Sequence, residues 1–112
     1  MISEYDISVI VPCYNANRYL NVCLESLKAQ RLPQIEMIFI DDGSTDSTGA
    51  MLDAFARTEP RAKVIHERNE GVSAARNRGI AMAKGRYIAF MDADDALEEK
   101  ALSTLFQAAV RT

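Results

Sequence analysis

Three carboxylates follow a short apolar run near the C-terminal end of the sequence. The run "YIAFM" is typical of a buried strand, and Asp92, Asp94 and Asp95 come after it within four positions. Two carboxylates two positions apart could share one hard cation, because Mg²⁺ and Mn²⁺ prefer oxygen ligands and are usually held by one or two carboxylates plus substrate phosphates. Asp92 and Asp94 are therefore candidates for binding a metal and a diphosphate, with a solvated acidic turn as the alternative interpretation.

Asp95 has a different place in the pattern. It lies three residues before Glu98, which is the spacing of a capping box ahead of the apolar-periodic segment that follows. We therefore expect Asp95 to cap the start of a helix.

Other candidate side chains follow the remaining apolar runs. Asp41 and Asp42 in "DDGS" could accept hydrogen bonds from a ribose hydroxyl or a base ring N–H, although Asp-Gly is equally a common turn. Tyr14 in "PCYN" could stack on a nucleobase or be an ordinary rim aromatic. Arg76 lies near the start of a predicted helix, where anions are favoured, or is a solvated surface arginine.

The histidine and the cysteines give no metal pattern. His66 is the only histidine and ends an apolar run, so we expect a structural or exposed role for it. Cys13 and Cys23 fit neither a zinc motif nor a disulfide framework. We expect them to be reduced, partly buried thiols in a cytosolic protein.

The elements that position these side chains alternate along the chain. The apolar patterns predict strands over 6–12, 35–42, 62–67 and 86–92, each followed by a helix, over 15–30, 44–58, 71–85 and 96–110. We expect Asn15 or Asn17 to cap the first helix, Ser44 the second with Asp46 in its first turn, and Gly85 to end the third. Strict alternation with apolar strands predicts a Rossmann-like, three-layer α/β/α fold with a mostly parallel sheet. Its ligand site would lie at the carboxyl ends of the strands.

Composition narrows the class of protein. The chain has 112 residues, 48% of them hydrophobic, and a net charge of −3, which suits one globular domain. No basic stripe is present, which argues against nucleic-acid binding. No apolar run approaches the roughly 20 residues that span a bilayer, and the N-terminus resembles no signal peptide. The C-terminus stops in a helical pattern, so we expect the chain to be cut from something longer.

Taken together, three segments resemble a known family. "VIVPCYN", "IDDGSTDST" and "NEGVSAARNRGIAMAKGRYIAFMDADD" are similar to the nucleotide-binding half of a family 2 glycosyltransferase with the GT-A fold. The resemblance extends from Ile7 to about Leu105. It implies that residues 1–112 form the nucleotide-sugar-binding part of such a domain, without the acceptor half.

The resemblance also implies roles for the residues on the base side of the site. Pro12 and Tyr14 would contact the base, Tyr14 by stacking. Asp42 would accept the ring N–H of uracil, with Asp41 as an adjacent support. Arg76 would lie near the base and the diphosphate.

On the metal side, Asp92 and Asp94 resemble the Asp-x-Asp motif of the family. Asp92 would face the ribose or the metal, and Asp94 would bind Mn²⁺ or Mg²⁺ directly. An indirect metal role for Asp95 stays open beside the helix cap.

The implied reaction is transfer of a sugar from a nucleotide-diphosphate sugar, with UDP favoured, to an acceptor hydroxyl with inversion. The acceptor would be a sugar, lipid or polysaccharide in cell-wall or polysaccharide biosynthesis. The general base is expected beyond Thr112, so a nucleotide-sugar-binding module without complete catalytic machinery is the alternative. The resemblance implies a cytoplasmic location and leaves open association of the full-length protein with the inner membrane face. Loss of the acceptor half would expose apolar surface at the sheet edge, so we also expect self-association.

Three rival classes fit the sequence poorly. A dinucleotide-binding oxidoreductase or a sugar nucleotidyltransferase would need a glycine-rich loop after the first strand, and "VPCYNAN" has no glycine. A phosphoacceptor signalling domain would need an acidic pair at the same place.

Overall fold

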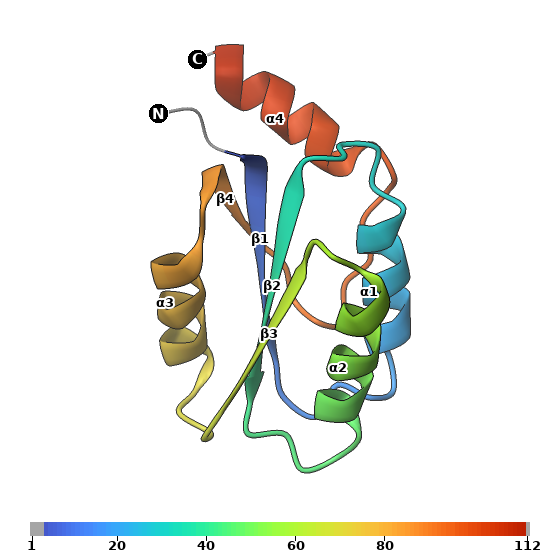
Figure 1. Ribbon diagram of the computed structural model, residues 1–112, viewed down its shortest axis with the longest axis vertical. Helices are drawn as coiled ribbons and strands as arrows, with labels where there is room; N and C mark the ends of the chain where they lie inside the picture. The colour runs from blue at the N-terminus through green and yellow to red at the C-terminus, as the bar shows by residue number, and fades with distance from the viewer. Residues whose placement is uncertain (1–3, 112) are drawn as a thin grey trace.

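A single parallel sheet organises the chain. The computed structural model describes residues 4–111, in which four strands and four helices alternate (Figure 1). The order in the sheet is β3-β2-β1-β4, and every neighbouring pair is parallel. This confirms the predicted α/β class. The elements are β1 (Tyr5–Cys13), α1 (Leu20–Lys28), β2 (Ile35–Asp42), α2 (Thr48–Thr58), β3 (Ala62–Glu67), α3 (Val72–Met82), β4 (Gly85–Phe90) and α4 (Ala101–Arg111).

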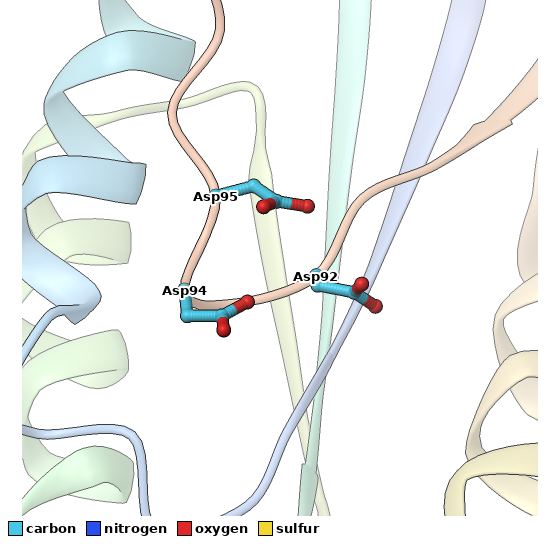
Figure 2. Close-up of side chains that lie close together, drawn as sticks. All are labelled: Asp92, Asp94 and Asp95. Atoms are coloured by element: carbon cyan, nitrogen blue, oxygen red, sulfur yellow. The ribbon is translucent and has the colours of Figure 1, made fainter.

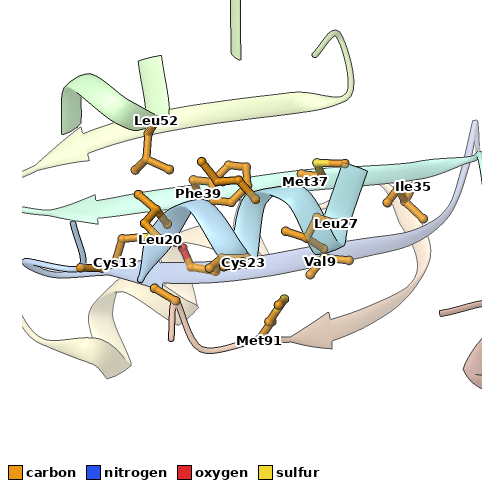
Figure 3. Packing of buried hydrophobic residues seen from close by; sticks show 14 of the residues in the cluster. Val9, Cys13, Leu20, Cys23, Leu27, Ile35, Met37, Phe39, Leu52 and Met91 are labelled. Carbon is orange, nitrogen blue, oxygen red and sulfur yellow. Dashed lines mark hydrogen bonds between the residues drawn. The ribbon is translucent and has the colours of Figure 1, made fainter. Parts of the chain in front are cut away.

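The larger core lies between the sheet and the helices α1, α2 and α4. Leu20, Cys23 and Leu27 of α1 recur at helical spacing and pack on Val9 of β1 and Phe39 of β2 (Figure 3). All eight residues of β2 are buried, which explains why its sequence is apolar on both faces except at its acids.

α3 covers the opposite face of the sheet (Figure 1). A smaller cluster there contains Ala75 of α3 with Ile10, Ile38 and Ile40 of the sheet. The helix approaches closely because it presents Gly79, where an added Cβ would lie 2.5 Å from Cγ2 of Ile10.

The strand order creates a switch point beside β1. β2 and β3 lie on one side of β1, whereas β4 lies on the other. The connections from β1 to β2 and from β2 to β3 therefore run in one direction across the sheet, and the connection from β3 to β4 runs in the other. Open α/β sheets bind ligands in the crevice that such a reversal leaves at the carboxyl ends of the strands.

The first two helices begin later than predicted. α1 begins at Leu20, and neither Asn15 nor Asn17 caps it. α2 begins at Thr48, so Ser44 is not its cap and Asp46 precedes the helix. Asp46 Oδ1 accepts the backbone N–H of Thr48 at 2.8 Å. The polar residues of these loops bind one another across the two connections, and this takes them away from the local capping roles that we predicted.

The last two helices also differ from the prediction. α3 ends at Met82, and Gly85 begins β4, where its N–H donates to Ser8 Oγ. β4 ends at Phe90, two residues before the predicted end. α4 begins only at Ala101, so the expected cap at Asp95 is wrong. Glu98 accepts the N–H of Lys100 through its side chain and that of Ala101 through its carbonyl, and Gln30 Oε1 accepts the N–H of Leu102.

A buried ionic group lies at the amino end of the sheet. The Glu36 side chain is fully buried and accepts hydrogen bonds from Ser8 Oγ at 2.7 Å, the Lys84 N–H at 2.9 Å and the Lys63 ammonium. Burial alone would raise the pKa of Glu36, but the hydrogen bond from Lys63 and the two others outweigh it and lower that pKa.

The edge strand β4 leaves apolar side chains uncovered. Ile88 and Phe90 are 42% and 51% exposed, and we call this pair the β4 strip. No helix between residues 4 and 111 is long and apolar enough to cross a membrane.

Candidate functional site

A pocket of about 280 Å³ opens at the carboxyl ends of β1 and β2, next to the start of α3. Three of the predicted site residues, Pro12, Tyr14 and Asp42, line it together. Tyr14 is half exposed, whereas Asp42 is 4% exposed. The pocket therefore offers an aromatic face and one buried carboxylate, which suits a flat ring that carries an N–H donor. The rest of the lining comes from Cys13, Asn69, Gly71 and Val72.

Asp42 is held firmly in this pocket. Its Oδ1 accepts the Glu70 N–H at 2.9 Å and its Oδ2 accepts the Gly71 N–H at 3.0 Å. Gly71 has a φ of 98°, a conformation that glycine adopts without strain. Each carboxylate oxygen has two lone pairs, so both can still accept a hydrogen bond from a ligand.

Glu67, which the sequence analysis did not select, lies beside Asp42. The two are register partners on neighbouring strands. The Glu67 side chain is 6% exposed, its oxygens have no hydrogen-bond partner within residues 4–111, and Arg78 Nε lies 3.7 Å from one of them. Burial and the neighbouring carboxyl of Asp42 raise the pKa of Glu67. In the sequence, the signal that could have identified Glu67 is its position at the end of β3, the strand that pairs with β2.

Asp41, which was predicted to bind the nucleotide as a support beside Asp42, does not line the pocket. Successive side chains of a strand point to opposite faces, so Asp41 and Asp42 diverge. Asp41 accepts the Ser44 N–H at 3.1 Å and lies 2.7 Å from Nδ1 of His66. His66 also lies 2.8 Å from Asp53 of α2. Any contribution of Asp41 to the pocket is therefore indirect.

Asn15 joins the loops that follow β1 and β2. Its side-chain oxygen accepts the N–H of Thr45 at 2.8 Å, and its own N–H donates to Ser44 Oγ at 3.0 Å. Asn15 has a φ of 49°, which asparagine tolerates better than most residues. Tyr14 directly precedes Asn15, so these hydrogen bonds fix the position of the residue that forms the aromatic wall of the pocket.

An acidic cluster lies on the loop after β4. Asp92, Asp94 and Asp95 are exposed, and one carboxylate oxygen from each lies within 4.8 Å of the others (Figure 2). Oxygen-only carboxylate donors at this spacing fit Mg²⁺ or Mn²⁺. The Asp95 side chain thus belongs with the two predicted metal ligands.

Arg76 lies next to the acidic cluster. Its guanidinium NH2 is 3.6 Å from Asp92 Oδ1, and its central carbon is 5.8 Å from the centroid of the Phe90 ring. Its Nε is buried and has no hydrogen-bond partner among the described residues. The side chain therefore keeps donor capacity for an anion beside the acids.

Cys13 and Cys23 are free and fully buried, rather than partly buried as predicted. Burial raises the pKa of Cys23 to about 12 and that of Cys13 further, so both remain neutral thiols.

Comparisons with known proteins show the family. A family model described as "Glycosyl transferase family 2" matches residues 8–112. The glycosyltransferase GlyG of Streptococcus pneumoniae is 46% identical over 102 residues, which are 90% of this chain and 34% of GlyG.

Two solved structures share the fold. Residues 1–349 of Staphylococcus aureus TarS in complex with UDP superpose with a TM-score of 0.82 at 34% identity, covering 94% of this chain and 31% of that one. The mannosyltransferase PcManGT of Pyrobaculum calidifontis, in complex with GDP-Man and Mn²⁺, gives a TM-score of 0.81 at 26% identity, covering 97% and 34%. The chain thus spans about a third of the length of these relatives.

Proposed function

The chain belongs to glycosyl transferase family 2, and on that premise we propose that residues 1–112 form the donor-binding part of an enzyme that uses a metal-bound UDP-sugar. The observation that carries the proposal is the meeting of two features at one end of the sheet. One is the pocket with its buried Asp42 and its aromatic wall. The other is the cluster of three carboxylates on the loop after β4.

In this proposal the pocket holds the nucleobase. The uracil ring N–H donates to Asp42, and Tyr14 stacks on the ring while Pro12 contacts its edge. The UDP complex of TarS supports a uracil base, and the GDP-Man complex of PcManGT fits the same logic because guanine also carries a ring N–H.

The diphosphate would then extend towards the acidic cluster. Asp94 would bind the metal directly, Asp92 would face the metal or the ribose, and Asp95 would help to hold the cation in place. A bound Mn²⁺ or Mg²⁺ supplies positive charge that offsets the charge on the departing diphosphate. Arg76 would donate to a phosphate oxygen through its guanidinium, because that side chain is partly exposed and already lies beside Asp92.

The acceptor hydroxyl would attack the sugar from the side opposite the diphosphate and invert the anomeric centre, which requires a general base. Glu98 and Glu99 are the only acids after Asp95 in the sequence. Glu98 caps α4, and Glu99 pairs with Arg31 at 2.7 Å. We therefore place the base outside this chain, in the part that binds the sugar, lipid or polysaccharide acceptor.

A second candidate is a nucleotide-sugar-binding module without complete catalytic machinery, in which the pocket and the acidic cluster bind the donor only. We place the reaction of the enzyme in cell-wall or polysaccharide biosynthesis. For either candidate we place the protein in the cytoplasm or on the inner membrane face.

Calorimetric titration with UDP, with and without Mn²⁺, tests the site. We expect binding that depends on the metal in the wild-type chain and is lost in Asp94→Ala. Glu99→Gln is the matched control, because it removes an exposed carboxylate that pairs with Arg31 and lies outside the cluster. UDP binding of equal affinity with and without Mn²⁺, or no UDP binding by a folded protein, would overturn the assignment.

A further inference from the structure

The imidazole of His66 is held between two carboxylates. Its Nδ1 lies 2.7 Å from Asp41 Oδ2, and its Nε2 lies 2.8 Å from Asp53 Oδ1. A ring nitrogen satisfies a carboxylate oxygen only by donating a proton to it, so this arrangement is complete only for the doubly protonated imidazolium. The hydrogen bonds with Asp41 and then with Asp53 raise the pKa of His66 above its ordinary value of 6.5, against the opposing effect of burial.

The surroundings of His66 leave room for this arrangement and add no competing charge. Gly49 of α2 faces the pair, and a Cβ there would lie 2.8 Å from Asp41 Oδ2 and 3.3 Å from Cε1 of His66. Cys13 of β1 is the register partner of Asp41, and its thiol stays neutral because burial raises its pKa. Within the described part of the chain, the charged groups that contact the ring are therefore Asp41 from β2 and Asp53 from α2.

A continuous set of hydrogen bonds leads from this ring to the pocket. The second oxygen of Asp41 accepts the Ser44 N–H at 3.1 Å, and Ser44 Oγ accepts the Asn15 N–H at 3.0 Å. Asn15 follows Tyr14, the aromatic wall of the pocket. The His66–Asp41 and Asn15–Ser44 links join different strand ends, and the Asp41–Ser44 link ties the loop after β2 to its own strand, so the position of Tyr14 depends on where Asp41 is held.

We propose that His66 is a positioning residue for the donor pocket: as an imidazolium it fixes Asp41, and through Ser44 and Asn15 it holds Tyr14 in place for the base. This inference rests on the proposed function of the pocket. Loss of one proton leaves one of the two carboxylates facing a ring lone pair, so the imidazole no longer ties Asp41 to Asp53 and holds the loop after β2 less firmly.

The sign of the pH effect follows from the direction of the shift. A group whose pKa is raised by folding contributes fully at pH values below its unfolded pKa, and the contribution is lost as the pH rises through its folded pKa. The stabilisation of the loops beside the pocket should therefore fall as the pH rises through the His66 titration. The affinity for UDP should fall with it, because the proposal makes the imidazolium the form that holds Tyr14 in place. The ring is about half exposed, which screens the effect, so we expect a fall of about threefold to tenfold.

Because His66 is the only histidine, NMR titration of its ring protons measures its pKa without ambiguity. UDP affinity in the presence of Mn²⁺ is then measured by calorimetry over the same pH series. His66→Gln supplies the baseline, because the titrations of the phosphate and the metal remain in that variant while the imidazole is gone. We expect the difference between the two profiles to follow the NMR titration.

Asp53→Asn keeps the shape of the α2 partner but removes its charge. It should lower the pKa of His66 and shift the midpoint of the UDP profile by the same amount, whereas Glu99→Gln should move neither. A purely structural histidine would change the pH dependence of unfolding but not of UDP affinity. If UDP binds but its affinity does not change with pH across the His66 titration, this inference alone is overturned. Absence of UDP binding by folded protein at every pH would overturn the proposed function as well.

Discussion

Replacing Glu36 with glutamine removes a charge that the structure buries completely at the end of the sheet opposite the pocket. Ser8 Oγ and the Lys84 N–H both donate to Oε1 of Glu36, and the Lys63 ammonium donates to Oε2. Glutamine can keep the first two hydrogen bonds through its single oxygen. Its NH₂ group would face the ammonium, so the third interaction is lost.

The cost follows from these three contacts. The two retained hydrogen bonds change from charge-assisted to neutral, at about 1 kcal/mol each, and removal of one partner of a buried ion pair costs about 3–5 kcal/mol in total. The Lys63 side chain is 34% exposed and can turn to water, which places the expected loss near the low end, at about 3 kcal/mol. A domain of this size should then melt on the order of 10 °C lower.

Urea unfolding of the wild-type chain and of Glu36→Gln at neutral pH measures this loss. Glu25→Gln is the matched control, because it makes the same change on the exposed side of α1 and should alter stability by less than about 0.5 kcal/mol. Since the folded chain lowers the pKa of Glu36, the carboxylate stabilises the fold at pH values above its ordinary value of 4.5. The difference between the wild type and the variant should therefore shrink as the pH falls below that value.

A loss below about 1 kcal/mol at neutral pH would refute this reasoning, because one neutral hydrogen bond alone is worth that much. So would a difference that stays constant or grows as the pH falls, since the charge of Glu36 would then not be its source. A changed urea m-value would point instead to an altered unfolded state.

Four further outcomes follow from the structure. Gly43→Ala should weaken UDP binding in calorimetry, because a Cβ at its φ of 74° would lie 2.6 Å from the backbone N of Asn69 in the pocket wall; unchanged affinity would count against this packing. Gly79→Ala should destabilise the chain in urea by about 1–2 kcal/mol, because contact with the buried Ile10 outweighs the gain in helix propensity, and a stabilised variant would contradict it. UDP should bind about tenfold more tightly than CDP, because only uracil has a ring N–H for Asp42, and equal affinities would argue against that role. The purified chain should self-associate through the β4 strip, and light scattering that finds a monomer at all concentrations would exclude this.

The strands of the sheet were predictable because the apolar pattern of each strand lies within one continuous segment of the sequence. The run "IEMIFID" is apolar enough to indicate a strand buried on both faces, and all of β2 is buried. Helix starts were less predictable, because they depend on partners distant in sequence. Asn15 and Ser44 have the residue types of helix caps, yet they bind each other across 29 positions. Local rules could not show that preference.

The candidate site was predictable in its parts but not in its arrangement. Tyr14 and Asp42 were selected as residues at strand ends, and they do meet in one pocket. Asp41 was grouped with Asp42 by adjacency, although strand alternation sends it to the other face. Glu67 was missed because its relation to Asp42 is a register between strands, which becomes visible only when the pairing is known.

The two hydrogen bonds that Asp42 accepts have a consequence for hydrogen exchange. The amides of Glu70 and Gly71 lie in an exposed loop, where exchange with solvent would ordinarily be fast. Their acceptor, however, is a buried carboxylate at the end of a central strand, 28 and 29 residues away. These amides can exchange only when the loop separates from β2. The protection of these two amides against exchange therefore measures how often the pocket opens, and the measurement needs no ligand.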